Sequence, residues 1–251
     1  MAQGQMLNFI SNHDLNRFTK DMVEAAQKAK ERVEADPYRS VVDPFSALFD
    51  AAVQDISLDE WMLKEQSRQI QKALQNKVGY FHQCVIGAMP GWESTGPYGG
   101  GYDVVNRDKK IIAEIKNKYN TTNSGSSNNL YNTLAGHLDF GMRGYTAYFV
   151  AVITKGKSRF DKPFVPSRRT AKREDLRVID GRSFYDMAAG EDGALRKLYE
   201  VLPAVLEGIL GKPIRGNGAK EIISSAVQDA PISSAYEWNT DFIALFQRAF
   251  Q

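Results

Sequence analysis

The sequence predicts an α/β protein in which a mixed central β-sheet is flanked by helices. Three observations support this class. Two segments before residue 86 have helical composition, at 14–35 and 57–85. Short β-prone segments then alternate with one further helical segment up to residue 180. Helical composition returns from residue 194, so helical N- and C-terminal extensions of the sheet region are expected.

The N-terminal helices are predicted from composition and from end signals. Residues 14–35 are rich in Ala, Glu, Lys and Gln, and Asp36-Pro37 ends the segment because the residue before a proline disfavours helical geometry. Pro44 suits the first position of a second, shorter helix. Ser57 and Glu60 fit a capping box, which predicts a long helix to about residue 85. Its core-facing stripe is expected to hold Leu58, Trp61, Met62, Ile70, Ala73, Leu74, Val78 and Phe81.

A β-hairpin is expected after this helix. Residues 89–101 contain two prolines and five glycines, which predicts a loop. The loop leads into short strands at 102–105 and 111–116, joined by a turn at 106–109. The hairpin is therefore predicted to place neighbouring antiparallel strands directly after a long helix.

The second half of the chain continues the alternation of helices and strands. An asparagine-rich stretch at 117–129 predicts a loop that leads into a helix at about 127–140. Residues 145–154 form a nearly continuous apolar run, which predicts a strand covered on both faces of the sheet. The remaining expected elements are a strand at 176–179 with a turn at Asp180-Gly181, a helix at 194–210 interrupted at Pro203, and an amphipathic helix at 241–250.

Three residues of the predicted hairpin point to metal-assisted chemistry. Alternate side chains of a strand share a face, so Glu114 and Lys116 lie together, and antiparallel pairing can bring Asp103 near Glu114. Converging carboxylates repel each other unless a cation such as Mg²⁺ binds them, and a neighbouring lysine can orient water or hold a phosphate. The alternative is a solvent-facing strand with alternating charges, which the apolar neighbours Ile111, Ile112, Ala113 and Ile115 disfavour.

The segments Gly101-Tyr102-Asp103, Glu114-Ile115-Lys116-Asn117-Lys118 and Asn120-Thr121 resemble the catalytic core of the PD-(D/E)XK nucleases. More narrowly, they resemble type II restriction endonucleases that recognise GGNCC. Similar segments at 8–11, 42–46, 79–83 and 181–185 extend the resemblance over most of the chain, and it departs from the superfamily pattern at Tyr102, where the proline would stand. The resemblance implies a restriction-endonuclease-like αβββαβ core in one domain over 1–251, with a helical N-terminal region (1–56), a catalytic core (57–180) and a helical C-terminal region (181–251).

The resemblance also implies the roles of the site residues. Asp103 and Glu114 are expected to bind Mg²⁺, with Ile115 as a further candidate ligand, and Lys116 is expected to be catalytic. In several relatives a glutamate of the preceding helix joins the site. Glu65 is the candidate here, because it lies on or beside the inward stripe; a structural ion pair or a helix-edge position is the alternative.

Two groups of polar and basic residues are candidates for DNA contacts. The first follows the catalytic strand and offers donors and acceptors to phosphates and base edges, although a polar turn and helix cap would have the same composition. The second lies in a segment at 155–177 with nine basic and three acidic residues, which a solvated loop would also explain. The candidates are Asn117, Lys118, Asn120, Thr121, Thr122 and Asn123 in the first group, and Arg168, Arg169 and Arg173 in the second.

The predicted function is a type II restriction endonuclease that cuts double-stranded DNA at a short specific site with Mg²⁺. A palindromic site would call for a homodimer in which each protomer cuts one strand, and a cognate DNA methyltransferase would act on the same site. The alternatives are a structure-specific repair or recombination nuclease and a non-catalytic DNA-binding module. A single cysteine excludes an intrachain disulfide, and the lack of a long apolar run or a secretory signal predicts no membrane partner and a cytoplasmic location.

Overall fold

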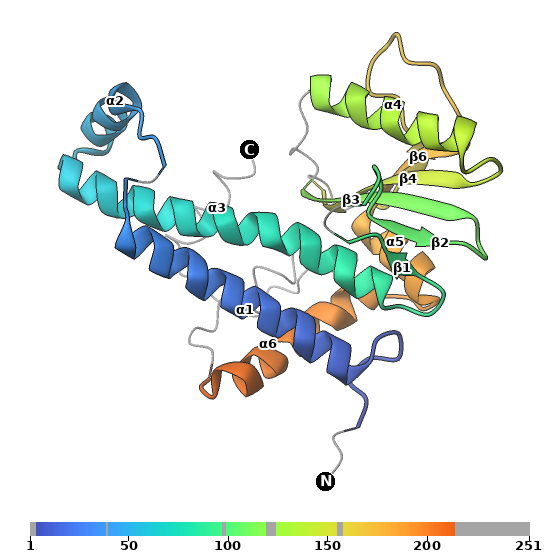
Figure 1. Cartoon of the computed structure of the whole chain (residues 1–251), viewed down its shortest axis with the longest axis horizontal. Coiled ribbons are helices and arrows are strands. Elements are labelled where there is room, and N and C mark those ends of the chain that lie inside the picture. Colours follow the sequence, from blue (N-terminus) through green and yellow to red (C-terminus); the bar gives the residue numbers. More distant parts are fainter. Residues whose placement is uncertain (1–3, 39, 97–98, 119–123, 155–157, 214–251) are drawn as a thin grey trace.

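A six-stranded mixed sheet forms the centre of the fold within the residues that the computed structural model describes, which are 4–38, 40–96, 99–118, 124–154 and 158–213 (Figure 1). The strand order is β1-β2-β3-β4-β6-β5. β3, β4 and β6 are parallel neighbours, whereas the other pairings are antiparallel. The predicted α/β class with a mixed sheet is confirmed. The strands are β1 Glu93–Ser94, β2 Val104–Asn106, β3 Ile111–Lys118, β4 Thr146–Ile153, β5 Asp161–Pro163 and β6 Leu176–Asp180.

Helices cover both faces of the sheet. The buried side chains fall into two clusters, one shared by α1, α3, α5 and α6 and the other formed with α4, and Figure 1 shows α4 on its own side of the sheet. The order α3, β1, β2, β3, α4, β4 reproduces the expected αβββαβ core. The helices are α1 Asn12–Ala35, α2 Pro44–Gln54, α3 Leu58–Gly87, α4 Ser124–Phe140, α5 Gly181–Ala189 and α6 Ala194–Leu210. None of them, as far as the chain is described, is both long and apolar enough to cross a membrane.

The helix ends follow the signals in the sequence. Ser57 caps α3, since its hydroxyl accepts from the Glu60 amide at 3.1 Å and the Glu60 carboxylate accepts from the Ser57 amide at 2.9 Å. This reciprocal pair confirms the capping box. Asp43 caps α2, with Pro44 in its first turn as predicted.

Three expectations about strand and turn boundaries are wrong, and one strand was not expected. The loop at 89–101 contains the short edge strand β1, and the basic segment contains β5, which is too short to show an alternating pattern. Asp180 does not begin a turn: its carboxylate accepts from the Ser183 amide at 3.0 Å and so caps α5. β3 also continues through Asn117 and Lys118 instead of ending at Lys116.

Two expectations about helices are wrong as well. Pro203 does not interrupt α6, because Leu198 and Val205 are buried on either side of it and their packing offsets the cost of about 3 kcal/mol of an internal proline. Of the eight predicted core residues of α3, Phe81 alone is fully buried, since the first half of α3 extends beyond the sheet with α2 (Figure 1). The helix expected at 241–250 lies outside the described residues.

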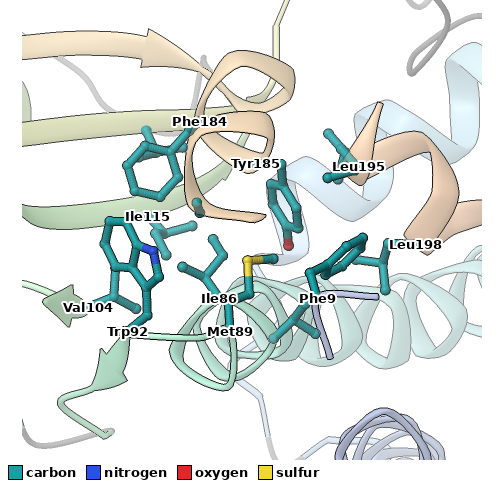
Figure 2. Close-up of a cluster of buried hydrophobic side chains, with 14 of the residues drawn as sticks. Phe9, Ile86, Met89, Trp92, Val104, Ile115, Phe184, Tyr185, Leu195 and Leu198 are labelled. Atoms are coloured by element: carbon teal, nitrogen blue, oxygen red, sulfur yellow. The ribbon is translucent and has the colours of Figure 1, made fainter. Parts of the chain in front are cut away.

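The two central strands are buried on both faces. In β4, Tyr148 and Val150 contact the cluster formed with α1, α3, α5 and α6, while Phe149 contacts the cluster formed with α4, which confirms the strand covered on both faces. In β3, Ile115 joins the first cluster, and Figure 2 shows it beside Trp92, which packs edge to face on Phe184. Because side chains alternate along a strand, burial of Ile115 turns its neighbours toward the α4 side.

Candidate active site

Asp103 stands directly before β2 and is held by hydrogen bonds from three segments. Its amide donates to the Ala113 carbonyl of β3 at 2.8 Å, and its own carbonyl accepts from the Thr95 amide at 2.9 Å and from Gln83 Nε2 at 3.0 Å. Oδ2 of its carboxylate accepts from the Ile115 amide at 2.7 Å. The carboxylate is therefore fixed against the edge of β3, just before the start of β2.

Glu114 and Lys116 lie on the α4 side of β3 and bind each other. Lys116 Nζ donates to Glu114 Oε1 at 2.6 Å, and the two side chains are 38% and 16% exposed for Lys116 and Glu114 respectively. The charge of Glu114 also acts on Asp103. Burial, and secondly the negative charge of Glu114, raise the pKa of Asp103 to about 6, although the hydrogen bond from the Ile115 amide lowers it. The structure thus brings the three predicted catalytic residues together.

This donor set fits a divalent cation. Two carboxylates that sit close enough to raise a pKa by repulsion would be neutralised by a hard cation. The amide and carbonyl of a strand residue point to the same edge, so the Ile115 carbonyl points to the edge where its amide meets Asp103. Among the described residues no group of three or more His, Cys, Asp and Glu side chains could hold a metal ion, so a cation here would take Asp103, Glu114, the Ile115 carbonyl and water.

The structure does not bring Glu65 together with the other three candidates. Glu65 and Gln83 are 18 residues apart on α3, which places Glu65 about 27 Å along the helix from the residue that contacts Asp103. Glu65 accepts from Arg68 and from Gln69 within its own helix. The structure therefore contains the alternative for this residue, a structural ion pair with Arg68.

Gln83 is the residue of α3 that reaches the site, and the sequence reasoning missed it. Its side chain is 5% exposed, and Nε2 donates to the Gly96 carbonyl at 3.2 Å as well as to the Asp103 carbonyl. A signal was present: Gln83 is an amide side chain inside the apolar segment from Phe81 to Ile86, where a polar group needs a buried partner.

The first group of candidate DNA-contact residues begins with two residues that lie on opposite faces of β3. Lys118 is exposed and lies on the same side of β3 as Glu114 and Lys116, whereas the half-buried Asn117 lies on the opposite side. Lys118 is therefore the next side chain after Glu114 and Lys116 on that face of β3. The other four candidates of this group, Asn120, Thr121, Thr122 and Asn123, lie outside the described residues.

The three arginine candidates differ in what binds them. Arg173 donates to both carboxylate oxygens of Asp175 at 2.9 Å and to Asp139 at 2.8 Å, so it ties the end of α4 to the segment before β6. Arg168 and Arg169 are exposed and form no ion pair with the described part of the chain. Their side chains can therefore contact a ligand without breaking an ion pair to a described residue, in contrast to Arg173.

Comparison with known proteins found relatives over most of the chain. A family model described as Eco47II restriction endonuclease matches residues 7–211. The chain is 37% identical over 223 residues to the type II restriction enzyme Eco47II of Escherichia coli, an alignment that covers 85% of this chain and 92% of the relative. It is 28% identical over 209 residues to the type II restriction enzyme Sau96I of Staphylococcus aureus, with 80% of each chain covered. No solved structure matches the chain.

Proposed function

Because the chain belongs to the Eco47II restriction endonuclease family, it is a DNA-cleaving hydrolase, and we propose that it is a type II enzyme that cuts both strands at a short specific site with Mg²⁺. The observation that supports this most directly is the convergence of Asp103, Glu114 and Lys116 at the end of a buried hairpin. The alternative of a structure-specific repair nuclease has no relative in its favour among these matches.

The carboxylates and the lysine of the site would have different roles in hydrolysis. Asp103, Glu114 and the Ile115 carbonyl would hold Mg²⁺, which neutralises charge on the phosphate and acidifies a water molecule. The ammonium of Lys116 donates to Glu114 and so stands beside the carboxylates that would hold the cation. From this position Lys116 would donate to a non-bridging phosphate oxygen or orient the attacking water.

The target and partners follow from the same assignment. We propose a palindromic site, GGNCC being the candidate from the sequence resemblance, and a homodimer that places one active site on each strand. Arg168 and Arg169 are candidates for bidentate contacts to guanine, and Lys118 for a phosphate contact. A cognate DNA methyltransferase would act on the same site without necessarily binding this protein.

Cleavage of plasmid and linear phage DNA tests the proposal. Wild type should give discrete fragments with Mg²⁺ and none with EDTA, and Lys116→Ala should bind the same DNA but cut about 10²–10⁴-fold more slowly. Lys30→Ala, on the exposed face of α1, is the matched control and should cut like wild type.

Three outcomes would contradict it. Intact DNA across Mg²⁺ and Mn²⁺ concentrations, with binding retained, would indicate a non-catalytic DNA-binding module. Cleavage confined to nicks or junctions would indicate a structure-specific nuclease. Equal rates for Lys116→Ala and wild type would remove the lysine from the mechanism.

A further inference from the structure

Helix α2 presents an apolar stripe that the described part of the chain leaves uncovered. One face of α2 buries Ala47 and Ala51 where the helix packs against α3. The other face carries the α2 stripe, which we define as Phe45, Leu48, Phe49 and Val53. These positions recur at helical spacing, so they form one continuous face that points away from α3.

The stripe is large enough to mark an interface. Phe45 and Phe49 are 73% and 70% exposed, and phenylalanines of roughly 150–250 Å² each therefore present roughly 200–350 Å² between them. Leu48 and Val53 enlarge this surface, as do Val41 and Leu58 at the two ends of α2. A standard protein interface buries roughly 800 Å² per partner, of which just over half is apolar, so the patch supplies most of that requirement.

The charge pattern favours a second copy of the chain over other partners. Asp50 is the one ionisable residue between Pro44 and Gln54, and its exposed carboxylate accepts from Trp61 Nε1 of α3 at 2.8 Å, on the side of the helix away from the stripe. A stripe without cations suits neither DNA phosphates nor an anionic membrane surface. Two such stripes can pack face to face without removing an ionised group from water, which is the self-complementarity that a two-fold contact needs.

The position of α2 leaves the catalytic residues free for a duplex. Trp61, which α2 contacts, and Gln83, which contacts Asp103, are 22 residues apart on α3, or about 33 Å along the helix. Figure 1 shows α2 at the end of α3 that lies away from the sheet. A contact there joins two copies without covering the active site of either.

We propose that the α2 stripe is the surface through which two copies of this chain pair across a two-fold axis. The inference rests on the proposed function, because a palindromic target calls for two symmetric active sites. An axis near the middle of α2 brings Leu48 and Phe49 close to the same residues of the second copy. Hydrophobic burial of both stripes then stabilises the pair.

Sedimentation of the full chain tests the surface. Wild type should sediment as a dimer, and Phe45→Glu and Phe49→Glu should each raise the dimer dissociation constant about 100-fold or more, because every substitution acts twice in a symmetric contact. Both sites are exposed, so circular dichroism should stay unchanged. Phe140→Glu is the matched control, since Phe140 is 89% exposed at the end of α4, and it should remain a dimer.

Cross-linking gives a second, independent measurement. In a Cys84→Ser background, Leu48→Cys or Phe49→Cys should form a covalent dimer with a short bis-maleimide, whereas Phe140→Cys should stay monomeric on a denaturing gel. A wild-type monomer at micromolar concentration overturns the proposal. A dimer that both glutamate variants leave intact also overturns it.

The remaining outcomes separate this proposal from its alternatives. If wild type is a monomer and the glutamate variants expose residues 214–251 to protease, that segment of the same chain covers the stripe, and the proposal fails. If the dimer depends on α2 but no DNA is cut, the interface stands and the proposed function fails. If the glutamate variants are monomers that cut plasmid as fast as wild type at nanomolar concentration, the α2 interface stands and the homodimer of the proposed function fails.

Discussion

Asp103 depends for its position on a residue that touches no reacting group. Gln83 and Thr95 both donate to the Asp103 carbonyl, so the backbone that carries the carboxylate is anchored to α3 and to the β1 segment. Partners that orient a metal ligand influence metal affinity as well as rate. Gln83 is therefore a positioning residue for the proposed magnesium site.

Gln83→Met should weaken the site without unfolding the protein. Loss of the amide donor loosens Asp103, and we expect the Mg²⁺ concentration for half-maximal cleavage to rise about 10–100-fold. Gln75→Met, at an exposed position of the same helix, is the control and should titrate like wild type. A rate loss that no Mg²⁺ concentration restores, together with unchanged metal dependence, would count against the positioning role.

His82 makes the stability of the protein depend on pH. Its ring is buried and its Nδ1 lies 2.6 Å from the Tyr185 hydroxyl, which links α3 to α5. Burial lowers the pKa of His82 from 6.5 to about 4. Between these values the unfolded chain binds more protons than the folded one, so stability is present above pH 6.5 and is lost as pH falls toward 4.

His82→Asn should remove the loss of stability that His82 causes at low pH. The amide can still meet the Tyr185 hydroxyl but does not titrate, so from pH 7 to 4 the unfolding free energy of wild type should fall by about 3 kcal/mol more than that of the variant. Urea unfolding at several pH values measures the difference. Parallel pH curves for the two proteins would show that His82 titrates normally in the fold.

Packing between elements explains a glycine at the start of α5. A Cβ built on Gly181 would lie 2.4 Å from the Val152 carbonyl oxygen and 2.5 Å from the Val152 Cα of β4. Both are backbone atoms of a central strand, so neither can move without disturbing the sheet that carries Glu114. The close approach of α5 to β4 therefore requires a residue without a side chain.

Gly181→Ala should lower the free energy of unfolding by about 2 kcal/mol or more, within the range of overpacking substitutions. Gly208→Ala is the control: a Cβ there meets nothing within 4 Å, and alanine in the helix α6 should be neutral or stabilising by up to about 1 kcal/mol. Thermal or urea unfolding measures both. Equal stability of the two variants would show that α5 can move away from β4 at little cost.

At the scale of the whole molecule, the partly buried carboxylate of Asp103 opposes folding. The pKa of Asp103 is raised from 3.8 to about 6, so the folded chain binds more protons than the unfolded one between these values. Stability therefore falls as pH rises from about 4 to 6 and stays reduced above that. A cation bound to the folded protein offsets this cost, because a ligand of the native state stabilises it.

Asp103→Asn should stabilise the metal-free protein while abolishing cleavage. In EDTA at pH 8 we expect its unfolding free energy to exceed that of wild type by about 1–3 kcal/mol, and the difference to vanish near pH 4. Mg²⁺ should raise the melting temperature of wild type and leave that of the variant unchanged. Two results would contradict this prediction: an Asp103→Asn variant that is less stable than wild type in EDTA, or an equal rise of both melting temperatures with Mg²⁺.

Contacts between residues that are close in sequence were predictable. The two residues of the capping box are three apart, and Glu114 and Lys116 are two apart, so propensity and strand alternation were enough to place them. Asp103 reaches Ile115 across a hairpin of 12 residues, and hairpin pairing was enough to bring it there. The α/β class and the convergence of Asp103, Glu114 and Lys116 could therefore be derived from local pattern.

Only the tertiary structure decided which distant side chains share a site. It placed Glu65 away from the other candidates, because a long helix separates residues that lie on one stripe. It also brought Gln83 to Asp103 across 20 residues and His82 to Tyr185 across 103 residues. It also left the α2 stripe uncovered by the described residues, although the composition of α2 resembles that of a buried helix. Periodicity states which side of an element is apolar, whereas the packing of whole layers determines what that side meets.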